Sequence, residues 1–393
     1  MTKRFTKPSN SNYQKELILK KTMKIVIAPD SFKGSISARG AADAIEAGLR
    51  SANSQKEPFE IIKCPIADGG EGTLDALVNE QDRITLTVTG TGGDPVKASY
   101  GYLGNTAVIE MAAAAGLTLV NETERDASTA TTYGVGELIL DALKRGFTKI
   151  ILTVGGSGTN DGGCGMLTAL GARFLNRNQT AFIPTGKTLS EIEEIDISQL
   201  SPLLKSAEFL IATDVKNPLC GENGATRVYG RQKGANDETL DRMESGMQHY
   251  AYVLNKICGR DVAKIEGCGA GGGLAAPLLA FCNAEIRSGI EAVLEANDFN
   301  QTLQGASLVI TGEGKIDAQS LCGKAISGVA NAAKTQNIPV VCFVGCIGDD
   351  INKLKALGVS DICAIADLAP SAEYSMQHAD ILLKRLAEEY IHL

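Results

Sequence analysis

The feature that most constrains the fold is a repeated unit: a short apolar run rich in Val and Ile, a glycine-containing loop, and an amphipathic helix. Lys24–Ala28 is the first such run, and the loop Pro29–Gly34 follows it. Ala41, Ile45 and Leu49 then recur at helical spacing. Continuous apolar runs indicate strands that are buried on both faces. Their alternation with helices predicts a doubly wound parallel sheet.

The same unit returns along the chain. Ile61–Ile66 predicts a second strand, and three further strands are predicted at 307–311, 338–344 and 361–365. Right-handed crossovers place the loops that follow parallel strands along one edge of the sheet. We therefore expect the residues after these strands to share one crevice.

The pattern changes after residue 82. Ile84–Thr89 and Val96–Tyr102 alternate between apolar and polar residues, and Gly104-Asn105 fits a hairpin turn. This segment predicts an antiparallel meander. The fold class predicted is therefore α/β, with a parallel-sheet domain interrupted by an inserted second α/β domain that has a mixed sheet, and with the active site in the cleft between them. The predicted limits are residues 23–82 and 286–393 for the parallel-sheet domain and residues 83–285 for the inserted domain.

Composition excludes several classes of protein. The 393 residues carry 38 Lys and Arg against 46 Asp and Glu, a net charge of −8. This balance argues against a nucleic-acid partner or an anionic membrane surface. No apolar stretch is long enough to cross a bilayer. The ten cysteines form no CxxC pair and only three His accompany them, so we expect buried free thiols and a cytoplasmic protein. Residues 1–22 are polar and basic, and we expect a disordered extension there.

Five of the predicted strands end in a glycine turn beside an acid or a hydroxyl. These exits carry Asp30 and Ser31; Asp68 and Glu71; Ser157, Asn160 and Asp161; Asp214; and Glu313 and Asp317. Glycines let backbone N–H groups approach an anion closely. Carboxylates suit a hard cation such as Mg²⁺. With Lys33, Lys315 and Lys324 nearby, the set predicts a shared anion and metal site of the kind that transfers phosphoryl groups.

Each of these features also has a simpler interpretation. A Gly-Gly pair is usually only a turn, a single Asp after a strand often caps a helix, and a lysine can be solvated. Pro184–Thr188 looks like the end of a P-loop, but Ala181 stands where that motif needs glycine. Gly267–Gly272 has the spacing of a dinucleotide-binding fingerprint, although Val262–Glu266 is a poor strand. An NAD(P)-dependent oxidoreductase acting on a small hydroxy acid and a non-catalytic anion-binding protein therefore stay as alternatives.

Eight ordered motifs carry a more specific signal. They are Ile27–Lys33, Pro65–Gly72, Ile109–Ala113, Thr131–Thr132 with Gly136–Leu138, Gly155–Gly163, Ala212–Leu219, Gln232–Ala235, and Val309–Asp317 with Gly323–Lys324. Together they resemble the bacterial glycerate kinase family that forms 2-phosphoglycerate, over essentially the whole chain from Met23. The sequence departs from the family pattern at Gly158, where Ala is common, at Lys315, where Arg is common, and at Gly34, where a charged residue is common.

The resemblance implies ATP-dependent phosphorylation of D-glycerate at the 2-hydroxyl, with Mg²⁺, giving 2-phosphoglycerate and ADP. It also implies that the parallel domain is flavodoxin-like. Either Asp214 or Asp317 would accept the hydroxyl proton, and Lys33 and Lys324 would neutralise the transferred phosphoryl group. Asp68 and Glu313 are the implied metal ligands. The remaining implied substrate and phosphate ligands are Ser31, Gly155, Gly156, Ser157, Asn160 and Lys315. The implied partners are D-glycerate and ATP, and a homodimer is left open.

Overall fold

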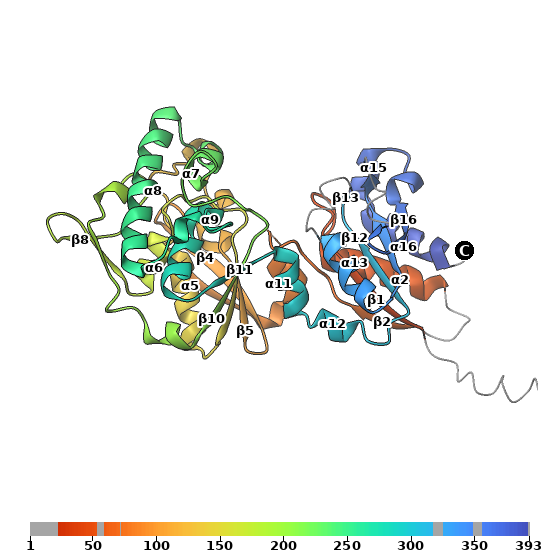
Figure 1. Ribbon diagram of the computed structural model, residues 1–393. Helices are drawn as coiled ribbons and strands as arrows, with labels where there is room; N and C mark the ends of the chain where they lie inside the picture. The colour runs from red at the N-terminus through yellow and green to blue at the C-terminus, as the bar shows by residue number, and fades with distance from the viewer. Residues whose placement is uncertain (1–22, 53–58, 71, 317–324, 349–355, 392–393) are drawn as a thin grey trace, which may run out of the picture.

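The computed structural model describes residues 23–52, 59–70, 72–316, 325–348 and 356–391. The chain forms two lobes, and helix α11 (Gly289–Ala296) lies between their sheets (Figure 1). One lobe holds a five-stranded sheet and the other a six-stranded sheet. This arrangement confirms the predicted fold class of two α/β units.

The five-stranded sheet is parallel throughout. Its strands in spatial order are β16 (Val359–Ala364), β14 (Val340–Val344), β12 (Leu308–Gly312), β1 (Lys24–Pro29) and β2 (Glu60–Lys63). All four neighbouring pairs run parallel. Counted along the chain, the spatial order is 2-1-3-4-5, which is the flavodoxin-like topology. The sheet therefore has the topology that the resemblance implies.

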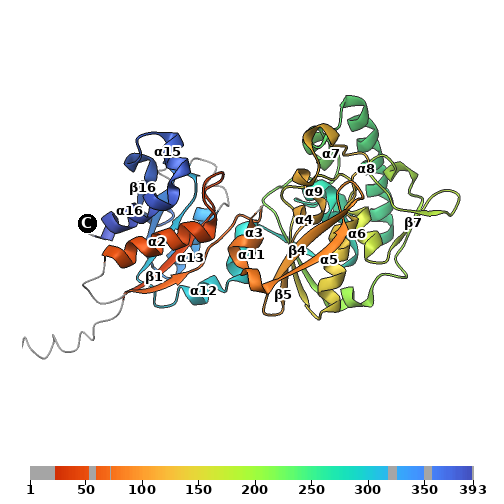
Figure 2. The same cartoon turned by 180° about the vertical axis from the view of Figure 1, so that it is seen from behind.

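Helices cover both faces of this sheet because successive side chains of a strand point to opposite faces. Ile25 and Ile27 pack in one cluster with α2 (Ala38–Ala52) and α16 (Ala379–Ile391). Val26 and Ala28 pack in the other cluster, which includes α13 (Ala325–Thr335). Figure 2 shows α2 in front of β1, whereas α13 lies in front of the sheet in Figure 1. Strand β1 is thus buried from both sides, as its continuous apolar run predicts.

The six-stranded sheet is mixed. Its spatial order is β11 (Glu285–Arg287), β10 (Glu208–Ala212), β6 (Lys149–Thr153), β5 (Thr106–Glu110), β4 (Pro95–Leu103) and β3 (Arg83–Thr89). The pairs β3–β4 and β4–β5 are antiparallel, and the other three pairs are parallel. The antiparallel meander predicted after residue 82 is therefore confirmed.

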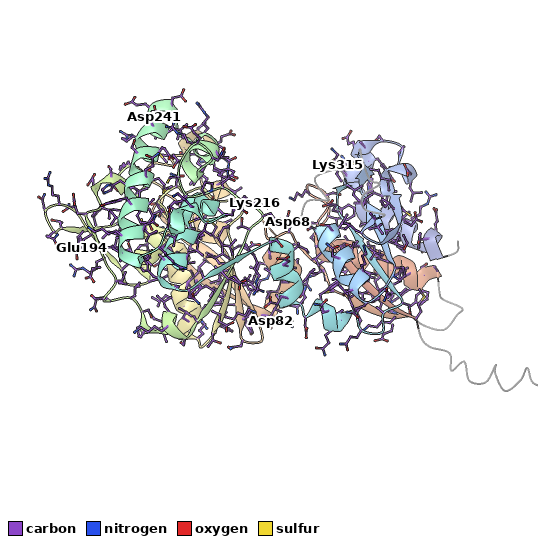
Figure 3. The ribbon with its side chains drawn as sticks, in the orientation of Figure 1. Asp68, Asp82, Glu194, Lys216, Asp241 and Lys315 are labelled. Carbon is purple, nitrogen blue, oxygen red and sulfur yellow. The ribbon has the colours of Figure 1, made fainter. Side chains whose placement is uncertain are left out.

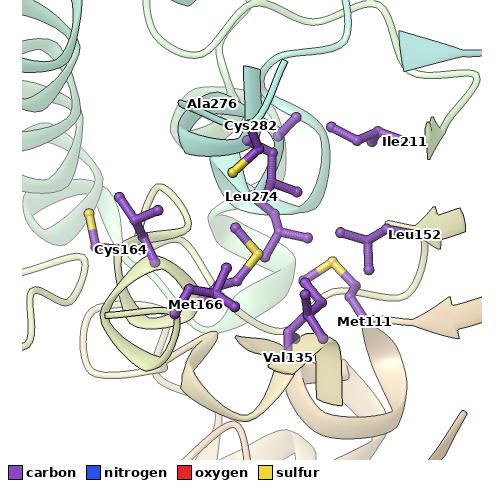
Figure 4. Close-up of a cluster of buried hydrophobic side chains, with 14 of the residues drawn as sticks. Met111, Val135, Leu152, Cys164, Met166, Ile211, Leu274, Ala276 and Cys282 are labelled. Atoms are coloured by element: carbon purple, nitrogen blue, oxygen red, sulfur yellow. The ribbon is translucent and has the colours of Figure 1, made fainter. Parts of the chain in front are cut away.

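The core of the mixed-sheet lobe is the largest apolar cluster of the described chain. Leu152 and Ile211 of the sheet lie in it with Val135 and Leu274 from the covering helices (Figure 4). The main covering helices are α5 (Tyr133–Lys144), α6 (Cys164–Ala169), α8 (Asp237–Cys258) and α10 (Ala275–Phe281). The sequence predicts helices at about 133–145, 237–257 and 274–283, and these correspond to α5, α8 and α10. Residues 171–206, which the sequence marks as loop-rich, add only a small sheet of β8 (Ala181–Phe182), β7 (Arg173–Leu175) and β9 (Glu194–Asp196).

The domain limits stay a prediction, although two elements bear on them. Strand β11 pairs with β10, so the predicted limit between residues 285 and 286 falls inside a strand of the mixed sheet. Helix α3 (Thr73–Leu77) contacts β4 and β5 of that sheet. Residues 1–22, predicted to be disordered, lie outside the described residues.

The cysteines of the described part are all free thiols. Cys64, Cys164, Cys268, Cys282 and Cys342 are buried, as predicted. The prediction is wrong for Cys346, which is exposed because it lies in the short strand β15 (Cys346–Ile347) at the rim of a pocket.

Candidate active site

A pocket of about 430 Å³ opens beyond the carboxyl ends of β1 and β12. This volume is typical of a site for a small molecule. Five residues that the sequence predicts as site residues line it together: Ser31, Lys33, Asp68, Glu313 and Lys315. In Figure 3, Asp68 and Lys315 lie on the side of the parallel-sheet lobe that is nearer to the other lobe. The expectation that these strand exits share one crevice is therefore confirmed for these five residues.

The strand ends are fixed to one another where the pocket begins. The Asp30 N–H donates to the Gly312 carbonyl at 2.8 Å, and the Thr311 hydroxyl donates to the Ala28 carbonyl at 2.7 Å. A Cβ atom on Gly312 would lie 1.7 Å from the Phe343 carbonyl oxygen, so this close approach requires glycine. The backbone thus holds the Asp30 and Glu313 exits side by side.

Asp30 is the most deeply placed carboxyl group of the pocket, with 6% of its surface exposed. Burial and, as a smaller cause, the nearby Asp68 carboxylate raise its pKa to about 7. A hydrogen bond from the Ser31 N–H, at 2.5 Å, opposes the rise. Sequence reasoning placed Asp30 at a strand exit but gave it no role. Its position directly after β1 was the signal that could have found it.

The pocket also has lysine side chains in its wall. The Lys33 Nζ lies 3.6 Å from an Asp68 carboxylate oxygen. The Lys33 side chain is 79% exposed and the Asp68 side chain 25% exposed, so solvent screens the pair. Lys33 can therefore exchange Asp68 for the oxygen of an anionic ligand at little cost. Lys315, in β13 (Lys315–Ile316), supplies a second cation to the same wall.

One side of the pocket is apolar. Phe32, Ile365, Ala366, Ala372 and Met376 line that side. Met376 belongs to α15 (Ala372–Gln377), and its backbone carbonyl accepts a hydrogen bond from the Ser35 hydroxyl. A pocket with charge at one side and apolar surface at the other suits a ligand that has both kinds of surface.

Asp214 lies outside this pocket. It lines a separate cavity of about 580 Å³ with Lys216 and Arg287, and its carboxylate accepts a hydrogen bond of 3.0 Å from the Gly289 N–H. A Cβ on Gly289 would lie 1.7 Å from the Asp68 carbonyl oxygen, so Asp214 and the Asp68 loop meet at the start of α11. Gly289 therefore contacts both Asp214 and the loop that carries the pocket residue Asp68. The two cavities nevertheless have no lining residue in common.

The segment Gly155–Gly158, which follows β6, belongs to the mixed-sheet lobe and does not line the pocket. Gly156 is exposed and has φ of +69°, which favours glycine. The Ser157 hydroxyl accepts a hydrogen bond of 2.7 Å from Lys233 Nζ. The structure therefore places the predicted Gly155, Gly156 and Ser157 on the lobe opposite the pocket.

Asn160 is fully buried and donates from its side-chain amide to the Thr226 hydroxyl at 2.9 Å. The next residue, Asp161, is also fully buried and accepts hydrogen bonds from the backbone N–H groups of Thr132, Gly163 and Gly165. Burial raises the Asp161 pKa, and these hydrogen bonds oppose the rise. The Asn160 side chain packs inside the lobe, and its predicted contact with substrate stays a prediction.

Three residues of interest fall outside the described part of the chain. They are Glu71, Asp317 and Lys324. The predicted roles of Asp317 as proton acceptor and Lys324 as phosphate ligand therefore stay predictions.

The geometry agrees with what comparison of the chain with known proteins finds. The sequence model of the Glycerate kinase family matches residues 25–393. The chain belongs to the glycerate kinase family. It is 44% identical over 371 residues to the Glycerate kinase of Bacillus subtilis (strain 168), covering 93% of this chain and 96% of that protein. It is also 44% identical over 347 residues to the Glycerate 2-kinase of Escherichia coli (strain K12), covering 87% and 90%.

The family assignment extends to the fold. A crystal structure of a Salmonella typhimurium LT2 protein that bears the name glycerate kinase 2 matches with a TM-score of 0.83 and 40% identity. The match covers 95% of this chain and 98% of that one. As a member of the glycerate kinase family the protein is a kinase enzyme. Helices that could span a membrane are absent from the described ranges.

The dinucleotide fingerprint is not realised in this glycerate kinase fold. Gly267 follows the short 3₁₀ helix η7 (Val262–Lys264) and not a strand. Gly271 and Gly272 have φ of +65° and +72°, which interrupts the helix that such a fingerprint needs. The oxidoreductase alternative thereby loses the feature on which it rested.

The predicted metal ligands fit a cation that the substrate helps to hold. Asp68 and Glu313 line the same pocket and offer the oxygen ligands that Mg²⁺ prefers. Within the described ranges no group of three or more His, Cys, Asp or Glu side chains could hold a metal by itself. Mg²⁺ is usually bound by one or two carboxylates together with substrate phosphates and water, so this arrangement is compatible with it.

Proposed function

We propose that the protein transfers the γ-phosphoryl group of ATP to the 2-hydroxyl of D-glycerate, producing 2-phosphoglycerate and ADP. The observation that carries the proposal is the pocket that gathers Asp68 and Glu313 with Lys33 and Lys315 at the strand ends. Carboxylates for a cation beside lysines for phosphate oxygens are what phosphoryl transfer requires. Membership of the glycerate kinase family supports glycerate as the acceptor.

In this proposal the pocket of the parallel-sheet lobe receives ATP. The apolar side formed by Phe32, Ile365 and Met376 suits the base, and Lys33 and Lys315 face the phosphates. Ser31 adds a hydroxyl donor to the same wall. Mg²⁺, when bound with the phosphates, would neutralise part of their charge. Asp68 and Glu313 would be its protein ligands.

The chemical step joins the glycerate 2-hydroxyl oxygen to the γ-phosphorus. The bond from that phosphorus to the oxygen shared with the β-phosphate breaks, and ADP leaves with the electron pair. The hydroxyl proton passes to a carboxylate, for which Asp214 and Asp317 are our candidates.

Gly155, Gly156 and Ser157 of the other lobe would bind the carboxylate of glycerate or a phosphate. The cleft between the lobes is then the reaction site. A cytoplasmic location belongs to the same proposal, and the choice between monomer and homodimer is open.

A coupled assay of ADP release with MgATP and D-glycerate tests the reaction. Phosphorus NMR of the product identifies which hydroxyl was phosphorylated. We expect ADP release and a 2-phosphoglycerate signal. A 3-phosphoglycerate signal would overturn the acceptor assignment, and absence of turnover at every Mg²⁺ concentration would overturn the function.

Substitution separates the two candidate bases. The Asn variant at the true base, Asp214→Asn or Asp317→Asn, should lower kcat by about 10²- to 10⁴-fold. Asp241→Asn is a matched control, because Asp241 lies on the exposed face of α8 in an ion pair with Arg227. If kcat fell equally in the control, the loss would not report on proton transfer.

A further inference from the structure

Lys233 is a buried lysine that the proposed mechanism does not use. It ends the 3₁₀ helix η6 (Arg231–Lys233), and 2% of its surface is exposed. Its Nζ donates to the Ser157 hydroxyl and to the Thr159 carbonyl, each at 2.7 Å. Both acceptors belong to the glycine-rich segment that follows β6. A lysine from a distant part of the chain therefore fixes this segment from the buried side.

Burying a lysine in this way is costly. Removal of an ammonium group from water has to be offset by hydrogen bonds and opposite charge. The two bonds satisfy two of its three N–H donors. The nearby charge of Asp161 opposes the fall in the Lys233 pKa that burial causes. No carboxylate of the described chain lies within ion-pair distance of Nζ. An apolar side chain would fill the same space without this cost, so the amine has a use other than packing.

Ser157 connects the buried lysine to the surface. Its hydroxyl oxygen accepts the Lys233 bond, which leaves the hydroxyl hydrogen to be donated elsewhere. Among the described residues that hydrogen has no protein acceptor. Ser157 is partly exposed and its neighbour Gly156 is exposed, so a ligand can reach the segment. The hydroxyl hydrogen is thus available for donation to a bound ligand, while the Lys233 amine occupies the acceptor side of the same oxygen.

We propose that Lys233 is a positioning residue that orients the Ser157 hydroxyl to donate to an anionic oxygen of a substrate, either the carboxylate of glycerate or a phosphate of the nucleotide. This inference rests on the proposed function for the identity of its substrates. In this inference Lys233 has no direct contact with substrate and acts through Ser157, while its bond to the Thr159 carbonyl holds the amine in place.

Steady-state kinetics separates the two anion sources. Lys233→Met and Ser157→Ala should each raise one KM by about ten- to a hundredfold, the loss expected for a charge-assisted hydrogen bond. A rise in the KM for D-glycerate identifies the carboxylate, and a rise in the KM for ATP identifies a phosphate. The double variant should lose no more than Ser157→Ala alone, because both changes remove one unit. Unchanged KM values, or losses that multiply in the double variant, would overturn the proposal.

Binding without turnover keeps this inference distinct from the proposed function. Calorimetric titration of the full-length protein with D-glycerate and, separately, with ADP should show the same selective loss of affinity for one probe. If the wild type binds a probe but does not turn over, the proposed function fails while this inference is still tested. Equal affinities of wild type and Lys233→Met for both probes would overturn the inference even with full activity.

A structural defect has a different signature. In Lys233→Ala, added ethylamine should restore part of the lost affinity by placing an amine in the vacated space, which it would not do for a misfolded segment. Lys205→Met is the matched control, since Lys205 is an exposed lysine of the same lobe in η5 (Pro202–Ser206). Failure of the amine to rescue a variant with a wild-type circular dichroism spectrum would count against the positioning role.

Discussion

Lys33 and Asp68 form an ion pair that solvent reaches, so the pair adds little to folding. We expect Lys33→Met to change the free energy of unfolding by less than about 1 kcal/mol. The same substitution should lower kcat/KM at least about a hundredfold, because the positive charge is needed where phosphate charge develops. Urea unfolding and the ADP-release assay measure the two quantities on one preparation.

Lys63→Met provides the control for this prediction. Lys63 pairs with Asp43 and Glu46 on the surface, away from the pocket residues. Its loss should leave kcat/KM within about twofold while the free energy of unfolding changes by a similar small amount. Full activity in Lys33→Met would show that the lysine has no catalytic use.

The buried lysine makes stability depend on pH. Burial lowers the pKa of Lys233 to about 7, whereas the unfolded chain keeps the ordinary value near 10.5. Between these values the unfolded state binds the proton and the folded state does not, so rising pH stabilises the fold. The free energy of unfolding of the wild type, compared with Lys233→Met, should therefore rise by about 3 kcal/mol from pH 7 to pH 9.5.

Chemical denaturation of both proteins at the two pH values measures this difference. Other groups cancel in the comparison because they are common to both proteins. A constant difference across the window would contradict a lowered Lys233 pKa in the folded protein.

The sequence identifies the pocket residues but marks Lys233 only as part of the motif Gln232–Ala235, without a role, for one physical reason. Ser31, Lys33 and Asp68 each lie within a few residues of a strand end, and parallel strands bring such residues together automatically. Lys233 reaches Ser157 only because η6 packs against a segment 76 residues earlier, which no local pattern encodes. Asn160 differs from both, since its position near a strand end predicts a contact with substrate but does not reveal that tertiary packing buries its side chain.

At the scale of elements, helix α11 connects the Asp68 loop to Asp214. Gly289 at its start leaves no room for a side chain, because a Cβ would lie 1.7 Å from the Asp68 carbonyl oxygen. Gly289→Ala should therefore displace the Asp68 loop, lower the free energy of unfolding by about 1–3 kcal/mol, and reduce kcat. Thermal unfolding and the ADP-release assay test both effects.

Gly92→Ala is the matched control, because a Cβ at Gly92 would meet nothing within 4 Å. It should change the free energy of unfolding by less than about 0.5 kcal/mol. A Gly289→Ala protein as stable and as active as this control would contradict the close contact at α11.

Long elements with strong periodicity were predicted well from the sequence. Helix α8 begins at the predicted residue 237 and ends one residue beyond the predicted end. Strands β13 and β15, of two residues each, have too few residues for a pattern and were not predicted. Strand β11 is as hard to place from the sequence, since three residues do not reveal which sheet they join.

At the scale of the molecule, the two groups of proposed ligands lie on different lobes. The pocket with Lys33 and Asp68 belongs to the parallel-sheet lobe, and Ser157 belongs to the mixed-sheet lobe. Phosphoryl transfer requires the attacking oxygen to lie about 3–3.5 Å from the phosphorus. Substrates held by both lobes can meet this requirement only when the lobes enclose them and exclude water.

We therefore expect the lobes to close when both substrates are bound. Small-angle X-ray scattering should show a smaller radius of gyration with a non-hydrolysable ATP analogue, Mg²⁺ and D-glycerate together than with any one of them. Removal of Mg²⁺ by a chelator should reverse the change, because the phosphates would then lose the proposed link through Mg²⁺ to Asp68 and Glu313. A radius of gyration unaffected by the complete mixture, in a protein that turns over, would mean that one lobe binds both substrates. In that case Ser157→Ala should leave both KM values unchanged, so the scattering and kinetic experiments check one another.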